Sequence, residues 1–291
     1  MSPQTNNRLA ELLEPLITQD GFTPTAIPGV DLMRATSPTP RRPIVYTPRI
    51  VVVAQGRKCV WLGDESFVYD ANNYLVLSVP MPLECETTAS EEEPLLGFAI
   101  TVDPILVGEL LLEMGDVPTS GPSTCVSSTE ITNDVIDASE RLVRTLSSPL
   151  DARVLGPQIV REIVYRVLRG ERGEVLQLLT SNATRYGMIA RALRRIQEDL
   201  SGDLDVATLA SEANMGVSTF HHVFRDVTAT SPVQYIKQVR LHRARALLTL
   251  EGVTAQEAAR RVGYSSASQF SREYRRMFGV SPASDRVAVT A

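Results

Sequence analysis

The sequence predicts an α+β protein of two domains, on three observations. Residues 50–102 hold short apolar or alternating runs with turn residues between them, which is typical of an antiparallel sandwich or barrel. After residue 104 the apolar positions recur every three or four residues, as in helices. Residues 204–278 contain the same pair of short helices twice. We therefore expect a β-rich first domain over 1–182 and an all-α second domain over 186–291.

The expected first domain begins with a helix over 7–18, ahead of the strands. Its strands are expected over 50–54, 59–63, 66–70, 74–79 and 95–102, with a turn at 80–82. Helices should follow over 105–114, 132–146 and 152–169. Apolar stripes on the last two helices leave two roles open, a dimer seam or a cover for the barrel of the same chain.

The repeat in the second domain predicts two helix-turn-helix motifs, over 204–228 and 254–278, joined by one long helix over 233–250. Aromatic residues and Ser-Pro pairs recur at an offset of 50 residues, and the first helix of each motif is expected to follow the same offset. In the first turn we expect Gly216 to be left-handed and Ser218 to cap the next helix. In the second turn the corresponding residues are Gly263 and either Ser265 or Ser266.

The charge is divided unevenly between the two parts. Residues 1–185 carry 15 Lys+Arg against 24 Asp+Glu, a balance of −9, whereas residues 186–291 carry 14 against 10, a balance of +4. This split indicates that only the second part meets a polyanion. No apolar run of about 18 residues exists, the N-terminus lacks a signal-peptide pattern, and the three cysteines are widely spaced. We expect a cytoplasmic protein without a membrane contact.

Two helix-turn-helix units on a rigid connector are a plausible reader of DNA, because each second helix can enter a major groove. The polar side chains on the outer faces of the second helices are the candidate DNA-binding residues. They are Ser218, Thr219, His221, His222, Arg225, Ser268, Gln269, Ser271, Arg272, Arg275 and Arg276. A solvated helix face is the alternative for the same residues.

The segments LASEANMGVSTFHHVFRD (209–226) and GYSSASQFSREYRRMFGVSP (263–282) resemble the AraC/XylS family of bacterial transcription regulators. The front segment VVVAQGRKCVWLGDESFVYDANNYLVLSV (51–79) is similar to one AraC-type N-terminal subgroup. The resemblance implies a cupin-like antiparallel β-barrel sensor with flanking helices, a helical dimerisation element and a promoter-binding domain. It further implies double-stranded DNA, a small-molecule effector, RNA polymerase and a second copy of the chain as partners.

By position, the resemblance implies base contacts from Ser218, His221, His222 and Arg225 in the first motif. In the second motif it implies base contacts from Ser268, Gln269 and Arg272 and phosphate contacts from Arg275 and Arg276. This chain has Ser218 and His222 where some members of the family carry Trp and Arg. Its target DNA sequence should therefore differ from theirs.

We expect no metal, no cofactor and no catalytic residue. His221 and His222 are adjacent, so on a helix they point about 100° apart, whereas chelating histidines are spaced i,i+4. The first domain contains no histidine at all, which argues against a metal-dependent cupin enzyme. An enzyme fused to a DNA-binding module remains the alternative from another functional class.

The effector is expected inside the barrel, against Tyr46, Trp61 and Tyr69, with Cys59 on the same face as Trp61. Plain core packing explains these residues as well. Cys59, Cys85 and Cys125 leave open a sensor of oxidants or electrophiles, for which only Arg57 and Lys58 beside Cys59 suggest a lowered pKa. A constitutive regulator whose first domain only dimerises is a further alternative.

Overall fold

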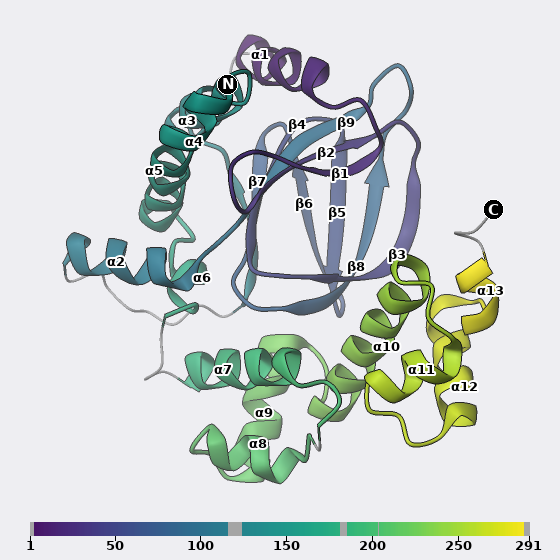
Figure 1. The fold of residues 1–291 in the computed structure, drawn as a ribbon. Helices are drawn as coiled ribbons and strands as arrows, with labels where there is room; N and C mark the ends of the chain where they lie inside the picture. Colours follow the sequence, from purple (N-terminus) through teal and green to yellow (C-terminus); the bar gives the residue numbers. More distant parts are fainter. Residues whose placement is uncertain (1–2, 116–123, 181–184, 203, 288–291) are drawn as a thin grey trace. The chain divides into compact units, whose positions relative to one another are not determined.

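The computed structural model describes residues 3–115, 124–180, 185–202 and 204–287 (Figure 1). Two compact units divide the chain. The first comprises Met1–Arg42, Tyr46–Val79 and Glu84–Ser181, and the second comprises Pro43–Val45, Pro80–Leu83 and Asn182–Ala291. No helix within the described ranges is both long and apolar enough to cross a membrane.

The first unit is built on one ten-stranded sheet in which the strand pairs are antiparallel. Its strands are β1 (Gly21–Pro24), β2 (Val30–Ala35), β3 (Thr39–Tyr46), β4 (Arg49–Gln55), β5 (Arg57–Leu62), β6 (Glu65–Asp70), β7 (Asn73–Leu77), β8 (Met81–Thr88), β9 (Leu95–Thr101) and β10 (Val126–Glu130). They follow the order β1-β2-β9-β4-β7-β6-β5-β8-β3, and β10 pairs with β7 off this path. Because the path runs from β1 to β3 without closing, the sheet is a half-barrel.

The expected fold class is confirmed, an α+β chain with an antiparallel half-barrel followed by a helical region. Sequence patterns missed β1, β2, β3 and β10, and β8 begins at Met81 inside the segment expected to be a turn. The helices of this unit are α1 (Pro3–Leu13), the 3-10 turn η1 (Glu14–Leu16), α2 (Pro104–Met114), α3 (Asn133–Thr145), α4 (Pro149–Val154), α5 (Gly156–Arg169) and α6 (Glu174–Gln177).

The helix expected over 152–169 is in fact two helices, α4 and α5, which meet at Leu155. Pro157 lies in the first turn of α5, and proline cannot supply the N–H that a continuous helix would need there. A Cβ on Gly156 would lie 2.7 Å from Ile27, so a larger residue there would crowd the sheet side. The break therefore lets α5 begin in close contact with the first unit's core.

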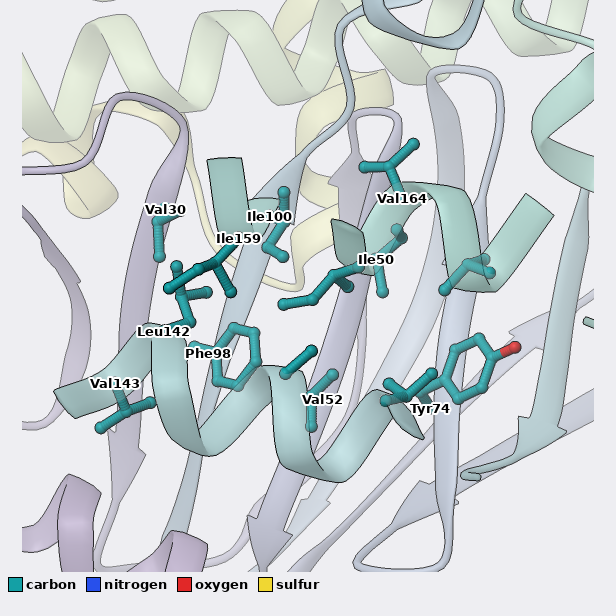
Figure 2. Close-up of a cluster of buried hydrophobic side chains, with 14 of the residues drawn as sticks. Val30, Ile50, Val52, Tyr74, Phe98, Ile100, Leu142, Val143, Ile159 and Val164 are labelled. Atoms are coloured by element: carbon teal, nitrogen blue, oxygen red, sulfur yellow. The ribbon is translucent and has the colours of Figure 1, made fainter. Parts of the chain in front are cut away.

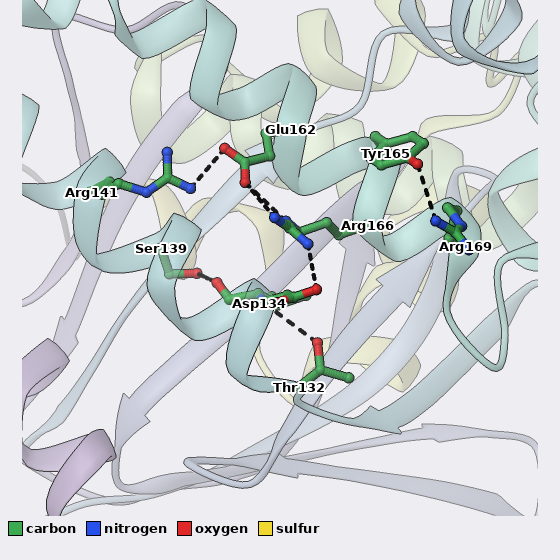
Figure 3. Close-up of polar contacts among 9 residues, drawn as sticks. Thr132, Asp134, Ser139, Arg141, Glu162, Tyr165, Arg166 and Arg169 are labelled. Carbon is green, nitrogen blue, oxygen red and sulfur yellow. Dashed lines mark hydrogen bonds and ion pairs between the residues drawn. The ribbon is translucent and has the colours of Figure 1, made fainter. Parts of the chain in front are cut away.

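The apolar stripes of α3 and α5 cover the sheet of their own chain. Val135, Leu142, Ile163 and Val167 are buried in one cluster with Phe98 and its neighbours on β2, β4, β7 and β9 (Figure 2). On the solvent side Glu162 of α5 accepts from Arg141 of α3 at 2.7 Å and pairs with Arg166, which also reaches Asp134 (Figure 3). These stripes thus take the second of the two roles left open by the sequence.

From Arg185 onward the second unit is helical. Its helices are α7 (Arg185–Glu198), α8 (Val206–Glu212), α9 (Val217–Thr228), α10 (Pro232–Leu250), α11 (Ala255–Arg261), α12 (Ala267–Phe278) and α13 (Pro282–Val287). Helix α10 has 19 residues and begins at a Ser231 cap followed by Pro232. At about 1.5 Å per residue it is roughly 28 Å long, which suits the expected connector between two reading helices.

Candidate nucleic-acid interface

Helix α9 is amphipathic, with an aromatic inner face. Phe220 and Phe224 are fully buried with ring centroids 5.5 Å apart, and Val223 and Val227 lie beside them. Phe224 also meets Tyr235 of α10 edge-on at 5.5 Å. The rings therefore fix how α9 is rotated on the connector, and with it which side chains face outward.

The turn before α9 departs from expectation in two respects. Asn214 is the left-handed residue, with φ 51°, whereas Gly216 is extended, with φ −65°. Gly216 is also the N-cap residue, so Ser218 is the second residue of the helix and does not cap it. Asparagine tolerates the left-handed region better than most residues, which the expectation based on glycine overlooked.

Helix α12 repeats this design with a better cap. Ser266 accepts a hydrogen bond from the backbone N–H of Gln269 at 3.2 Å, and Gly263 is left-handed with φ 81°. Phe270 and Tyr274 are fully buried on its inner face, and the Tyr274 hydroxyl donates to Asp285 at 2.6 Å. The local signals predicted for this motif are present.

The two motifs differ by one residue in the turn. Helices α9 and α12 are related by an offset of 50, but α8 and α11 are related by 49. The expected uniform offset of 50 is therefore wrong for the first helices. The left-handed Asn214 and Gly263 follow the offset of 49, so the additional residue of the second motif lies between Gly263 and α12.

Every candidate DNA-binding side chain lies exposed on α9 or α12. On α9 they are Ser218, Thr219, His221, His222 and Arg225. On α12 they are Ser268, Gln269, Ser271, Arg272, Arg275 and Arg276. The structure thus brings together the polar residues singled out in the sequence on two helix faces, each opposite an aromatic core.

Among the described residues, the arginines of α12 have no ion-pair partner, in contrast to those of α11. Arg272, Arg275 and Arg276 form no ion pair within the described part of the chain. Arg260 and Arg261 of α11 both pair with Glu257 at 2.8 Å. These arginines hold the pKa of Glu257 down at about 2 by hydrogen bonding and by their charge. An approaching polyanion therefore meets three unneutralised guanidinium groups on α12.

His221 and His222 lie on the outer face of α9, and His222 approaches Asp226 one turn later at 3.5 Å. The His222 side chain is 80% exposed. Across the described ranges no group of three or more His, Cys, Asp and Glu residues is arranged to hold a metal ion. The adjacent histidines therefore sit as polar surface residues of a candidate reading helix.

In the first unit, Tyr46 and Tyr69 lie together within the half-barrel. Their hydroxyl oxygens are 3.0 Å apart, and the Cys85 Sγ lies 3.5 Å from that of Tyr46. All three side chains are buried. Burial raises the pKa of both tyrosines above their ordinary value, so both hydroxyls stay protonated and neutral.

Trp61 and Cys59 share a face of β5, as expected, but it is the outer face. Lys58 pairs in register with Tyr69, whereas Trp61 pairs with Ser66. Lys58, Val60 and Leu62 are buried, so the prediction that Trp61 lines the interior is wrong. Two alternating faces of similar apolarity make the phase of such a strand hard to assign from sequence. On the outside the Arg41 guanidinium covers the Trp61 ring at 4.5 Å.

Lys58, which the sequence singled out only as a neighbour of Cys59, is a buried charged residue of β5. Its side chain is 9% exposed and has no hydrogen-bond or ion-pair partner among the described residues. Burial lowers its pKa. The electrostatic effect of Cys85 opposes this shift, and the charges of Arg42 and Arg49 add to it. The signal was available, because a strand that places Cys59 and Trp61 on one face must place Lys58 on the other.

The pKa values of Cys59 and Cys125 are raised, not lowered. Partial burial and the charge of Glu86 raise the pKa of Cys59 despite the neighbouring Arg57 and Lys58. Complete burial raises the pKa of Cys125 to about 12. A raised pKa keeps a thiol protonated, which disfavours the reactivity expected of an oxidant sensor.

The comparisons with known proteins address both units. Residues 26–175 match the family described as AraC-type transcriptional regulator N-terminus, and residues 209–287 match the helix-turn-helix domain family. The probable transcriptional regulator LumQ of Photobacterium leiognathi is 33% identical over 30% of this chain and 35% of its own length. The transcriptional activator RhaS of Escherichia coli is 23% identical over 52% of this chain and 54% of its own length.

This chain therefore spans between about a third and a half of the length of these relatives. Among solved structures, unsaturated fatty acid-bound ToxT from Vibrio cholerae superposes with a TM-score of 0.61. The superposition covers 92% of this chain and 96% of ToxT at 12% sequence identity. At that identity the likeness concerns the fold.

Proposed function

The chain belongs to the family of AraC-type transcriptional regulators, and from this premise we propose that it binds specific DNA sites and responds to a small molecule. The observation that carries the proposal is the pair of helices α9 and α12. Each exposes a row of polar side chains opposite a buried aromatic core. Residues of this kind address base edges and phosphates in a major groove.

The second helix-turn-helix motif supplies most of the electrostatic attraction. Arg272, Arg275 and Arg276 are free to meet phosphates or guanine, whereas α9 carries a single arginine, Arg225. Asp226 beside His222 lowers the local attraction for phosphate further. We propose that α12 both anchors the protein on DNA and reads bases, and that α9 adds sequence preference through His221 and His222.

For the first unit we propose an effector that carries an anionic group. ToxT has been solved with an unsaturated fatty acid, which is a carboxylate. In this chain Lys58 is a buried ammonium group near two arginines and without a carboxylate partner in the described ranges. An anion brought beside it would restore the electrostatic balance that burial removes.

Regulation follows from linkage. A ligand that binds one arrangement of the protein more tightly than another shifts the population toward that arrangement and changes DNA affinity by the same free energy. We also propose a homodimer that contacts RNA polymerase in the cytoplasm. Exposed apolar residues on α2 and α4, such as Leu112 at 86% and Leu150 at 59%, are candidate contact positions for a second copy.

Selection of bound DNA fragments by the full chain, with and without a metabolite extract, tests the proposal. We expect one enriched motif with two half-sites and a change in yield when the extract is present. Enrichment of no motif at low salt would refute specific DNA binding. A thermal-shift screen of organic acids tests the effector, because a ligand held only by the folded state raises the melting temperature. If an organic acid raises the melting temperature of Lys58→Met as much as that of the unmodified protein, Lys58 does not bind the effector.

A further inference from the structure

Glu273 of α12 is a nearly buried carboxylate that gathers three donors. Its side chain is 13% exposed. It accepts from Lys237 Nζ of α10 at 2.9 Å, from the Tyr264 hydroxyl at 2.7 Å and from Gln269 Nε2 at 3.2 Å. Gln269 is one turn earlier on the same helix and is an exposed candidate base reader. Glu273 thus connects the connector, the turn and the reading face.

The ionised state of Glu273 fixes the amide of Gln269. Burial raises the pKa of Glu273, but the hydrogen bonds from Tyr264, Lys237 and Gln269 outweigh burial and hold the pKa below its ordinary value. An ionised carboxylate accepts hydrogen bonds and donates none. The Gln269 amide must therefore turn its NH₂ group toward Glu273, and a flipped amide would place two acceptors against each other.

One donor and one acceptor of Gln269 remain for DNA. The second hydrogen of Nε2 is free to donate, and Oε1 is free to accept. In the major groove adenine presents the N7 acceptor beside the N6 donor, whereas guanine presents two acceptors. With one of its two hydrogens held by Glu273, the amide cannot give both to guanine. The remaining pair of groups complements adenine.

We propose that Glu273 is a positioning residue that makes Gln269 select adenine at one base pair of the DNA site. The inference rests on the proposed function, because it needs α12 in a major groove. Lys237 and Tyr264 hold the carboxylate in the interior, so Glu273 itself does not face the bases.

The experiment uses the full chain and the DNA motif enriched by selection. The base pair read by Gln269 is the one at which Gln269→Ala loses its preference. There we expect the unmodified protein to favour adenine by about 5- to 150-fold, the discrimination of one good bidentate contact. Glu273→Gln, which can both donate and accept, should reduce this preference to about threefold or less.

Controls separate orientation from general stability. Glu257→Gln removes the same charge from α11 without touching a candidate reader, so it should keep the adenine preference. Lys237→Arg keeps a positively charged donor beside Glu273 and leaves the Gln269 contact, so it should also keep the adenine preference. DNA with 7-deazaadenine at this position tests the contact without any protein variant, and should bind as weakly as the other bases.

Each outcome is decisive. If the unmodified protein enriches no motif, the proposed function fails. If it enriches a motif but Gln269 selects a base other than adenine, the inference is overturned while DNA binding stands. Retained adenine preference in a folded Glu273→Gln, or full binding to 7-deazaadenine DNA, overturns it in the same way.

Discussion

The ring of His242 meets the ring of Phe278 edge-on, with centroids 5.3 Å apart and planes at 85°. His242 lies on the connector α10, and Phe278 is the last residue of α12. The Arg245 guanidinium lies over the Phe278 ring, 4.7 Å from its centroid. The imidazole of His242 packs against the same ring, so it lies close to a fixed positive charge. This packing anchors the second motif on the connector and keeps the imidazole neutral.

Acid should therefore weaken the second unit through His242. Burial, and then the charge of Arg245, lower the pKa of His242 from 6.5 to about 4. The unfolded state takes up the proton first, so stability present above pH 6.5 is lost as the pH falls toward 4. Between pH 7 and pH 5 we expect about 2 kcal/mol of destabilisation from this group. Urea unfolding followed by circular dichroism measures it.

His242→Phe is the matched variant, because phenylalanine keeps an aromatic ring against Phe278 but cannot be protonated. Its loss of stability between pH 7 and pH 5 should be smaller by the same amount. An unchanged difference between the two pH values would contradict a neutral, buried His242.

Arg272→Ala should weaken binding to a cognate site by about 1–3 kcal/mol and relax the preference at one base position. Arg272 lies exposed on α12 without an intramolecular ion pair among the described residues, so nothing in the protein competes for its fork of donors. Fluorescence anisotropy on site variants measures the effect. Equal weakening on all sequences would show that Arg272 contacts phosphate and not a base.

The salt dependence of DNA binding should distinguish arginines without an ion pair from arginines that already pair with a carboxylate. Arg275→Gln should reduce the slope of log K against log salt concentration by about 0.9, since one phosphate contact releases about one counterion. Arg260→Gln should change it less, because Arg260 already pairs with Glu257 at 2.8 Å. The same slope change for both variants would mean that the ion pairs on α11 open when DNA binds.

The repeated motifs were predictable because each carries its signals locally. The spacing of the aromatic residues predicts the buried faces of α9 and α12. The Ser266 cap and the left-handed Gly263 lie next to the helix that they begin, so they too can be read from the local sequence. Asn214 shows the limit of such rules, because its left-handed backbone takes the role expected of Gly216. The extra residue in the second turn was not predicted. The aromatic residues of α9 and α12 keep the offset of 50, and this offset was extended to α8 and α11, which are offset by 49.

The first unit was less predictable because its decisive contacts are non-local. Strand β5 carries Lys58 and Trp61 on opposite faces, and only pairing with β6 and β8 shows which face is buried. The hydrogen bond between Gln269 and Glu273 could not be predicted from the sequence either. The other donors to Glu273 are Lys237 and Tyr264, which lie 36 and 9 residues away. The sequence placed Gln269 on the outer face of α12 but did not show its hydrogen bond with Glu273.

The core beneath α3 and α5 should be the main source of stability in the first unit. Phe98 is completely buried there, so Phe98→Ala should cost about 3–5 kcal/mol through lost burial and a residual cavity. Glu11→Ala, at an exposed residue of α1, is the control and should change stability by less than about 0.5 kcal/mol. Trp61 is the single tryptophan of the chain and lies on β5 of this unit, so its fluorescence during urea unfolding reports on the first unit alone. Equal midpoints for the two variants would mean that the sheet does not depend on its helical cover.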